Sequence, residues 1–182
     1  MTYGHGHGLA GMRTDSFYLP YPYGRTYAIM QTNHGAYSHD SPGSRYTLDF
    51  TLAVGDTICA ADAGVVVARV EGYRYGGGNR KWDGFDNFIT LYHPAHNVYT
   101  QYVHLQHAGS LVELGEHLRA GQPIGLAGAT GWTSKEHLHF VVAKFTSAGR
   151  ESLPFSFGRR TVRTSESYRK GERVRNGIRP AE

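Results

Sequence analysis

The sequence predicts an all-β fold, either a sandwich or a barrel, and three observations support this. Short runs rich in β-branched and aromatic residues alternate with segments that contain Gly, Pro or Asn. No long stretch has the apolar spacing of an amphipathic helix. The 24 glycines and 13 tyrosines also favour strands joined by tight turns. At 182 residues, the chain is long enough for one well-buried domain.

The expected strands follow one another along the chain with a turn signal between them. Residues 87–105 form the clearest hairpin, with Pro94-Ala95-His96-Asn97 as its turn. Residues 111–118 are a helix candidate, but Gly115 and Gly121 favour turns there. The strand candidates are residues 46–52, 64–70, 87–92, 98–105, 123–127 and 137–145.

The chain divides into three expected parts. Residues 1–16 are rich in Gly and His and are expected to be a flexible N-terminal segment. Residues 17–157 are expected to form the domain, and residues 158–182 a basic C-terminal segment. The net charge of +4 lies in residues 151–182, which hold eight basic against four acidic residues. Such a segment suits either an anionic surface or plain solvation.

Composition excludes several classes of protein. No apolar run approaches the ~20 residues of a membrane-spanning helix. The single cysteine, Cys59, rules out an internal disulfide and a four-cysteine zinc site. No nucleic-acid-binding motif accompanies the basic segment. No secretory leader is visible at Met1, so we expect either no export by that route or a trimmed mature form.

The most informative segment is Glu136-His137-Leu138-His139-Phe140-Val141-Val142. Side chains alternate across a strand, so His137 and His139 are expected on one face, with about 7 Å between their Cα atoms. Leu138, Phe140 and Val142 are then expected in the core. Histidines fixed in this way suit a metal site, although an isolated pair of this kind is also common on a solvated face.

Two further segments offer partners for this pair. Asp49 lies between Leu48 and Phe50, where a buried carboxylate requires either a metal ion or hydrogen bonds from backbone amides or Arg45. His39 lies in the preceding loop. His104 lies in the run 99–105, and strand alternation places it on the face of Thr100 and Tyr102. His93, His96, His107 and His117 lie near turns and are expected to be exposed and unrelated to the site.

In this order the segments resemble the lysostaphin-type zinc metallopeptidases. The segments that carry the resemblance are Ser38-His39 with Tyr46 to Phe50, Val54 to Val66, Tyr102 to Leu105, Gly121 to Gly125 and Gly131 to Phe140. They cover residues 18–157 in the family's order. The resemblance implies an antiparallel barrel-sandwich of duplicated, hybrid type with a metal site on the floor of a groove.

The resemblance also implies an activity and a set of site residues. The zinc ligands fall on His39, Asp49 and His139, and the two catalytic histidines on His104 and His137. The expected protein is a zinc-dependent endopeptidase that hydrolyses peptide bonds of bacterial peptidoglycan, in the stem peptide or the cross-bridge. It would act in the periplasm or outside the cell, with peptidoglycan peptides as partners, no nucleic acid, and a monomer favoured.

The first ligand departs from the shorter family pattern, in which three residues separate a histidine from the aspartate. Arg45 stands there, and a guanidinium stays protonated and cannot bind zinc. The sequence around His39 resembles family members that have a longer loop between the histidine and the aspartate. His34 is the competing choice for this ligand.

Two other functions fit parts of the sequence. A non-catalytic binding or activator module would share the fold and the metal. A lipoyl- or biotinyl-type carrier barrel would need an exposed lysine on a hairpin tip, for which Lys81 is the candidate.

Overall fold

The computed structural model describes residues 16–158 and 163–180, and it confirms the all-β prediction. Among these residues, the regular elements besides strands are two short 3-10 turns, Arg80–Trp82 (η1) and Ser165–Ser167 (η2). Residues 1–15 of the expected flexible segment lie outside the described residues. Within the described ranges, no helix is both long and apolar enough to cross a membrane.

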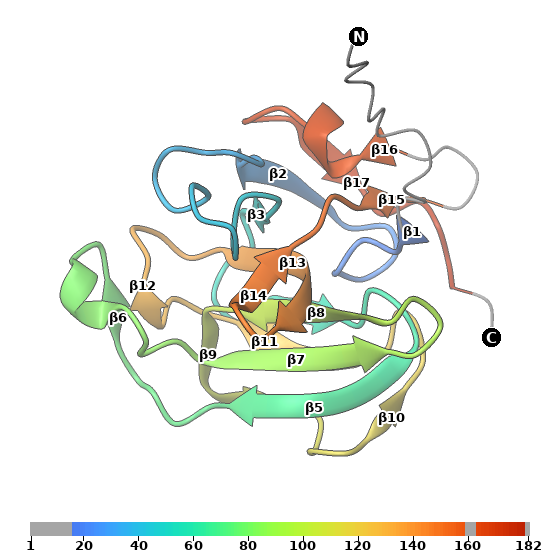
Figure 1. Cartoon of the computed structure of the whole chain (residues 1–182), viewed down its shortest axis with the longest axis horizontal. Helices are drawn as coiled ribbons and strands as arrows, with labels where there is room; N and C mark the ends of the chain where they lie inside the picture. Colours follow the sequence, from blue (N-terminus) through green and yellow to red (C-terminus); the bar gives the residue numbers. More distant parts are fainter. Residues whose placement is uncertain (1–15, 159–162, 181–182) are drawn as a thin grey trace, which may run out of the picture.

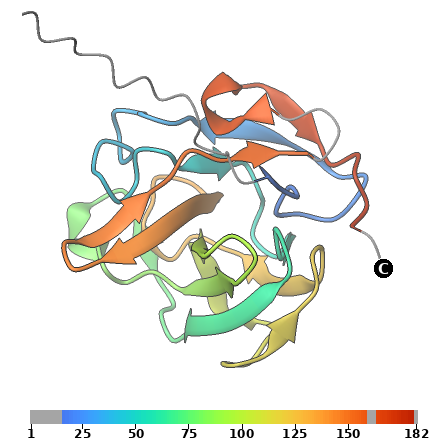
Figure 2. The same ribbon diagram turned by 45° about the vertical axis from the view of Figure 1, so that its right-hand side comes forward.

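One antiparallel sheet organises the molecule (Figure 1). Its strands run in the spatial order β10 (His117–Leu118), β5 (Gly64–Val70), β7 (Phe88–His93), β8 (Val98–Val103), β13 (Leu138–Thr146), β3 (Leu48–Phe50), β2 (Thr26–Gln31) and β17 (Arg173–Arg175). The strand β14 (Gly149–Ser152) forms a hairpin with β13. Figure 2 shows this hairpin between β5 and β7 on one side and β2 and β17 on the other.

Three smaller sheets complete the fold. The strands β4 (Thr57–Cys59), β11 (Pro123–Ala127) and β9 (Leu105–Ser110) form an antiparallel sheet. A second sheet contains β1 (Ser16–Phe17), β15 (Ser156–Phe157) and β16 (Arg163–Thr164). The strands β6 (Gly76–Gly77) and β12 (Gly131–Trp132) pair in parallel. This last pair brings the loop after β5 beside the segment that leads to the histidine pair.

Most of the expected strands are present with small shifts of their ends. The strands expected over 64–70 and 123–127 are β5 and β11. The predicted hairpin is confirmed, because β7 and β8 pair from Phe88↔Val103 to His93↔Val98. No helix forms over residues 111–118, where the two-residue strand β10 follows a turn at Gly115.

The core lies on one face of β3, β8 and β13. Leu138, Phe140 and Val142 are almost fully buried, as the alternation predicts. Phe140 packs edge-on or tilted against the rings of Tyr102 and Phe155, with 5.4 Å between ring centroids in each pair. Burial of each such side chain stabilises the fold by about 1.5–3 kcal/mol, which fixes the strands that carry the site.

The described part of residues 158–182 packs onto the rest of the fold. The strand β17 pairs with β2, and Tyr168 belongs to the core. The Tyr21 hydroxyl donates to the carbonyl of Val174 at 2.9 Å, and the Asn176 amide donates to the carbonyl of Tyr21 at 2.6 Å. Apolar packing therefore attaches this segment, while its basic side chains Arg169, Lys170, Arg173, Arg175 and Arg179 are exposed. A domain boundary at residue 157 stays a prediction.

Candidate metal centre and cleft

A cleft of about 750 Å³ lies over the face of β3, β8 and β13 that points away from the core. Its floor includes Asp49, Val103 and His139. These three residues are in register, since His139 lies opposite Asp49 on one side and opposite Val103 on the other. Strand pairing therefore places a carboxylate and an imidazole side by side, with 3.0 Å between Asp49 Oδ1 and His139 Nδ1.

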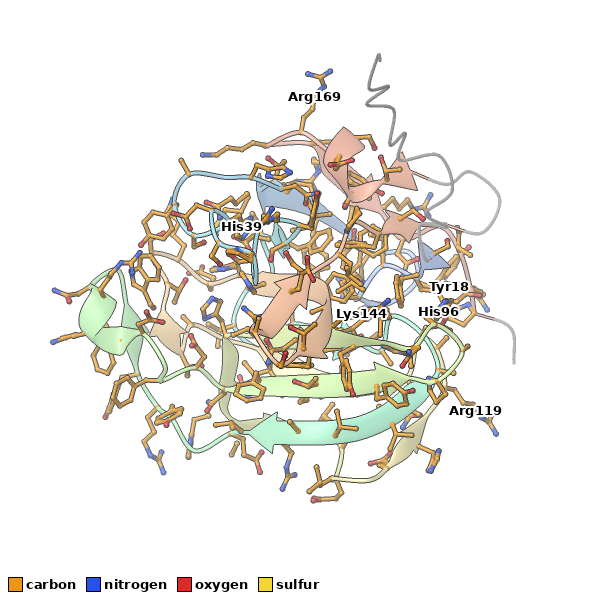
Figure 3. All side chains as sticks on the ribbon, viewed as in Figure 1. Tyr18, His39, His96, Arg119, Lys144 and Arg169 are labelled. Atoms are coloured by element: carbon orange, nitrogen blue, oxygen red, sulfur yellow. The ribbon has the colours of Figure 1, made fainter. Side chains whose placement is uncertain are left out.

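His39 comes to the same point from the loop between β2 and β3. Its backbone N–H donates to the carbonyl of Gly35 at 2.9 Å, which curls the loop into a turn. The Nδ1–H of its fully buried ring donates to the carbonyl of Thr32 at 2.8 Å. Nε2 therefore has a free lone pair, and it lies 3.3 Å from Asp49 Oδ1. Figure 3 shows His39 among the interior side chains, whereas Arg119 and Arg169 project from the periphery.

His137 stands just before β13, with its ring over Asp49. Its Nδ1 lies 2.8 Å from the carbonyl of Lys135 and 3.1 Å from the hydroxyl of Thr133, so Nδ1 carries the proton. Its Nε2 lies 3.7 Å from Asp49 Oδ1. The expected grouping of His137 and His139 at one site is present.

His104 reaches the site by a different route from the expected one. The prediction that it shares a face with Thr100 and Tyr102 is wrong, because those two side chains are fully buried in the core. His104 has a left-handed backbone conformation, with φ of 68°, and this turn between β8 and β9 reverses its direction. Its ring lies 4.6 Å from the ring of His137, between centroids.

The orientation of His104 depends on two neighbours. Its Nδ1 lies 2.8 Å from the carbonyl of Thr130 and 3.1 Å from Asp86 Oδ1. Asp86 fits there only because residue 131 is glycine, since a Cβ at Gly131 would lie 1.7 Å from Asp86 Oδ1. Nε2 of His104 therefore has no proton in the neutral ring and faces the cleft.

The ionisation of the cluster suits a cation. Burial alone would raise the pKa of the Asp49 carboxyl, but the surrounding His137, His139 and His39 keep that pKa far below its usual range. Burial lowers the pKa of the His139 imidazole to about 4, against the opposing effect of Asp49. Burial also lowers the pKa of His137. At neutral pH, Asp49 is thus ionised while His137 and His139 are neutral, the forms in which these groups bind metals.

Two polar atoms at this point lack a hydrogen bond. Among the described residues, His39 Nε2 and Asp49 Oδ1 are buried and have no partner of suitable geometry. Such atoms are costly to bury, and a cation between them would satisfy both. One ligand atom each from His39, Asp49 and His139 lies within 4.8 Å of the others. Zinc ligands about 2.0–2.1 Å from the ion at a tetrahedral angle lie roughly 3.3 Å apart, close to the distances observed here.

A second triplet, His104, His137 and His139, is also compact enough to hold an ion. It contains no carboxylate and leaves Asp49 Oδ1 and His39 Nε2 unsatisfied. The donor set with Asp49 therefore fits a divalent ion better. Arg45 makes no ion pair with Asp49 in the described residues, so the structure does not provide the arginine partner considered from the sequence.

The sequence did not predict several residues of the site. Asp86, Thr130 and Thr133 orient His104 and His137, and their spacing along the chain gives no signal of this. The same cleft is lined by Arg150 of β14.

The expectation that His93 is exposed is wrong. Its ring is fully buried, with Nδ1 2.8 Å from the Ala63 carbonyl and Nε2 2.8 Å from the Thr100 hydroxyl.

The fold and the cluster together define the class. An all-β sheet carries two imidazoles and an ionised carboxylate at the floor of an open cleft, with two further imidazoles beside them, as in a metallopeptidase. The chain belongs to peptidase family M23, whose sequence profile matches residues 43–151. The match includes Asp49, His104, His137 and His139, and it begins four residues after His39.

Individual relatives agree with this family. The chain is 33% identical to lysostaphin of Staphylococcus simulans over 121 residues, which cover 62% of this chain and 21% of lysostaphin. It is 38% identical to the peptidoglycan DD-endopeptidase ShyC of Vibrio cholerae over 93 residues, 50% of this chain and 18% of ShyC. The chain thus spans about a fifth of the length of these relatives.

The fold also matches a solved structure. A zinc-containing peptidase from Vibrio cholerae superimposes with a TM-score of 0.50 at 21% identity, covering 86% of this chain and 41% of that one. This similarity concerns the fold alone.

Proposed function

We propose that this chain is a zinc-dependent endopeptidase that cuts peptide bonds of bacterial peptidoglycan, and that it acts outside the cytoplasm, where that polymer lies. Membership of family M23 and the peptidoglycan endopeptidase among its relatives support the proposal. One observation carries it: His39 Nε2 and Asp49 Oδ1 are buried and unsatisfied beside His139 Nδ1, at the floor of an open cleft.

His39, Asp49 and His139 would hold the zinc ion. Two imidazole nitrogens and one carboxylate oxygen are a common donor set for catalytic zinc, which keeps a further position open. When bound, zinc supplies a Lewis acid that polarises the scissile carbonyl and makes a water molecule acidic near neutral pH. The hydrogen bond from His39 to Thr32 supports this assignment, because it fixes the tautomer that presents Nε2.

His104 and His137 would move and stabilise charge during hydrolysis. Their Nδ1 atoms are engaged by backbone carbonyls, so both Nε2 atoms are available to the reacting groups. Burial favours the neutral form of His137, which suits it to accept a proton from the attacking water. Asp86 lies 3.1 Å from Nδ1 of His104 and orients the ring, so that its Nε2 would face the developing oxyanion.

Loops on both sides of the cleft would contact the peptide. Tyr37, from the loop that carries His39, stacks on Trp132 with 5.0 Å between ring centroids. The guanidinium of Arg80 lies 4.3 Å from the centroid of the same tryptophan ring. All three residues of this stack line the cleft, where they would contact a bound peptide.

Digestion of purified peptidoglycan tests the proposal. The zinc-loaded protein is incubated with sacculi that contain direct cross-links and with sacculi that contain glycine cross-bridges, and the fragments are identified by mass spectrometry. We expect new peptide termini in at least one of the two, and their loss when a chelator is present. Intact sacculi with fully zinc-loaded protein would refute the proposal.

A pair of histidine variants separates an enzyme from a non-catalytic module. His137→Ala should bind one zinc ion per chain but lose turnover by about 10²- to 10⁴-fold, the usual contribution of a general base. His117→Ala is the matched control, because His117 is exposed on β10, away from the cleft. A turnover of His137→Ala equal to that of the wild-type protein would contradict the role assigned to His137.

A further inference from the structure

Arg150 is a largely buried cation in the cleft with no carboxylate partner. Among residues 16–158 and 163–180, no Asp or Glu oxygen is found within 4.0 Å of its guanidinium. Its side-chain hydrogen bond has a neutral partner, since Nη1 donates to Oε1 of Gln101. Burial lowers the pKa of Arg150, and the negative charge of Asp86 opposes this effect without reversing it. A buried cation without a counterion is costly unless a ligand provides one.

The guanidinium is fixed in place rather than free to reach solvent. Arg150 lies on β14 directly opposite Phe145 of β13. Gln101 is itself oriented, because its Nε2 donates to the Thr90 hydroxyl at 3.2 Å, which turns Oε1 toward Arg150. Gly43 packs against the other side, where a Cβ would lie 3.3 Å from Arg150 Nε. The remaining N–H groups form a planar donor pair of the kind that binds a carboxylate through two hydrogen bonds.

Strand register places Gln101, the hydrogen-bond partner of Arg150, relative to the metal centre. Gln101 lies opposite Val141, and both are two residues along their strands from the pair Val103 and His139. Two residues of strand span about 6.6–6.8 Å. An extended peptide in the cleft rises at the same rate, so Arg150 would meet a group about two residues from the bond over the metal. Both sites line the same cleft.

We propose that Arg150, oriented by Gln101, is a carboxylate-binding subsite of the cleft, so that the preferred substrate carries a free carboxylate within about two residues of the bond that is cut. The inference rests on the proposed function and adds the substrate's charge to it. The other cations of the cleft fit this role less well. Arg80 stacks on Trp132, and Lys135 and Lys170 are exposed and therefore solvated.

The carboxylate could come from a chain terminus or from an acidic side chain, and matched peptides distinguish the two. A synthetic peptide of the cross-link is made in three forms: with all carboxylates free, with the C-terminal carboxylate amidated, and with the side-chain carboxylates amidated. The wild-type enzyme should cut the free form with a kcat/KM about 10- to 100-fold above that of one of the two amidated forms, the usual effect of a hydrogen-bonded charge. The form that is cut poorly identifies the source of the carboxylate.

Three variants test whether Arg150 causes this preference. Arg150→Gln should reduce the ratio of kcat/KM for the free substrate to kcat/KM for the amidated substrate to within about twofold. The amidated substrate has no carboxylate for Arg150 to bind, so the substitution should lower kcat/KM only for the free form. Arg150→Lys should keep part of the preference, since it retains the charge but not the two-point geometry. Arg119→Gln makes the same charge change at an exposed position at the edge of the molecule and should leave the ratio unchanged.

A binding measurement separates failure of this inference from failure of the proposed function. Zinc-loaded His137→Ala should bind the free peptide about 10- to 100-fold more tightly than the poorly cut form, by calorimetry, and the Arg150→Gln double variant should not. Equal Kd values for free and amidated peptides, or a preference that survives Arg150→Gln, would overturn the carboxylate subsite even if cleavage is normal. A charge preference in binding without any cleavage would instead refute the endopeptidase and leave the subsite standing.

Discussion

The two faces of β3, β8 and β13 differ by one residue along each strand and have opposite chemistry. On one face, Leu48, Tyr102 and Phe140 are in register and fully buried, and the Tyr102 hydroxyl accepts from the Ala61 N–H at 2.7 Å. On the other face, Asp49, Val103 and His139 are in register, and Asp49 Oδ1 has no hydrogen bond in the described residues. The first face is complete without a ligand, whereas the second becomes complete only with a cation.

This difference shows how a sheet positions a metal site. Aromatic packing of Phe140 determines the register, and the register then places His139 beside Asp49. A slip of one residue would exchange the two faces and bury the imidazole in the core. Packing on the core face therefore determines the geometry of the site face. Variants on the core face should mainly change stability, and variants on the site face should mainly change activity.

The largest expected effect is on the site face. Asp49→Asn keeps the shape of the side chain but removes the charge that balances a divalent ion. We expect loss of stoichiometric zinc and a fall in activity of about 10⁴-fold, because the Lewis acid chemistry is lost. Without metal, the folded state should lose some stability at neutral pH, since His137, His139 and His39 hold the pKa of the Asp49 carboxyl far below its usual range and so stabilise its ionised form in the folded protein.

Metal analysis and thermal melting of chelated protein check this prediction. The control is Glu113→Gln, which removes a charge from an exposed side chain. Stoichiometric zinc in Asp49→Asn, or a loss of stability in the metal-free protein as large as that of a core variant, would mean that the proposed contrast between the faces is wrong.

The core face should show the reverse behaviour. Phe140→Ala leaves a cavity among Tyr102, Phe155 and Phe157, so we expect a loss of about 3–5 kcal/mol in the free energy of unfolding. Zinc should still bind to the fraction that remains folded. Phe145→Ala is the matched control on the same strand, because Phe145 is 53% exposed and should cost less than about 1 kcal/mol.

Urea titrations of both variants give these free energies. Similar losses for Phe140→Ala and Phe145→Ala would show that the outer end of β13 contributes as much as the core.

The sequence predicted the core face better than the site face. Alternation over residues 137–145 identified Leu138, Phe140 and Val142 as core, because a period of two is a local signal. The direction of His104 was not predictable in this way, since one left-handed residue reverses the alternation without changing the sequence pattern. Burial of His93 and the packing of β17 on β2 depend on contacts between distant parts of the chain. The contact between Arg150 and Gln101 has the same origin, because β14 and β8 are brought together by pairing on opposite sides of β13.

Alkaline pH should weaken the buried region around β4, with the smallest of the expected effects. Burial raises the pKa of the Cys59 thiol to about 12 and also raises the pKa of the Tyr102 phenol. In the unfolded chain a thiol loses its proton near pH 8.5. Above that pH, the unfolded state binds fewer protons than the folded state, so stability falls as pH rises and continues to fall until the folded thiol titrates.

Urea unfolding at pH 8 and pH 10 measures this loss. We expect a decrease of about 2 kcal/mol from Cys59, because its pKa exceeds that of the unfolded thiol throughout this interval. Cys59→Ala should lower stability at pH 8 by about 1 kcal/mol but flatten the dependence on pH by about 2 kcal/mol. An unchanged slope in Cys59→Ala would mean that the thiol titrates normally in the folded protein, and that the core around β4 is more open to water than its packing indicates.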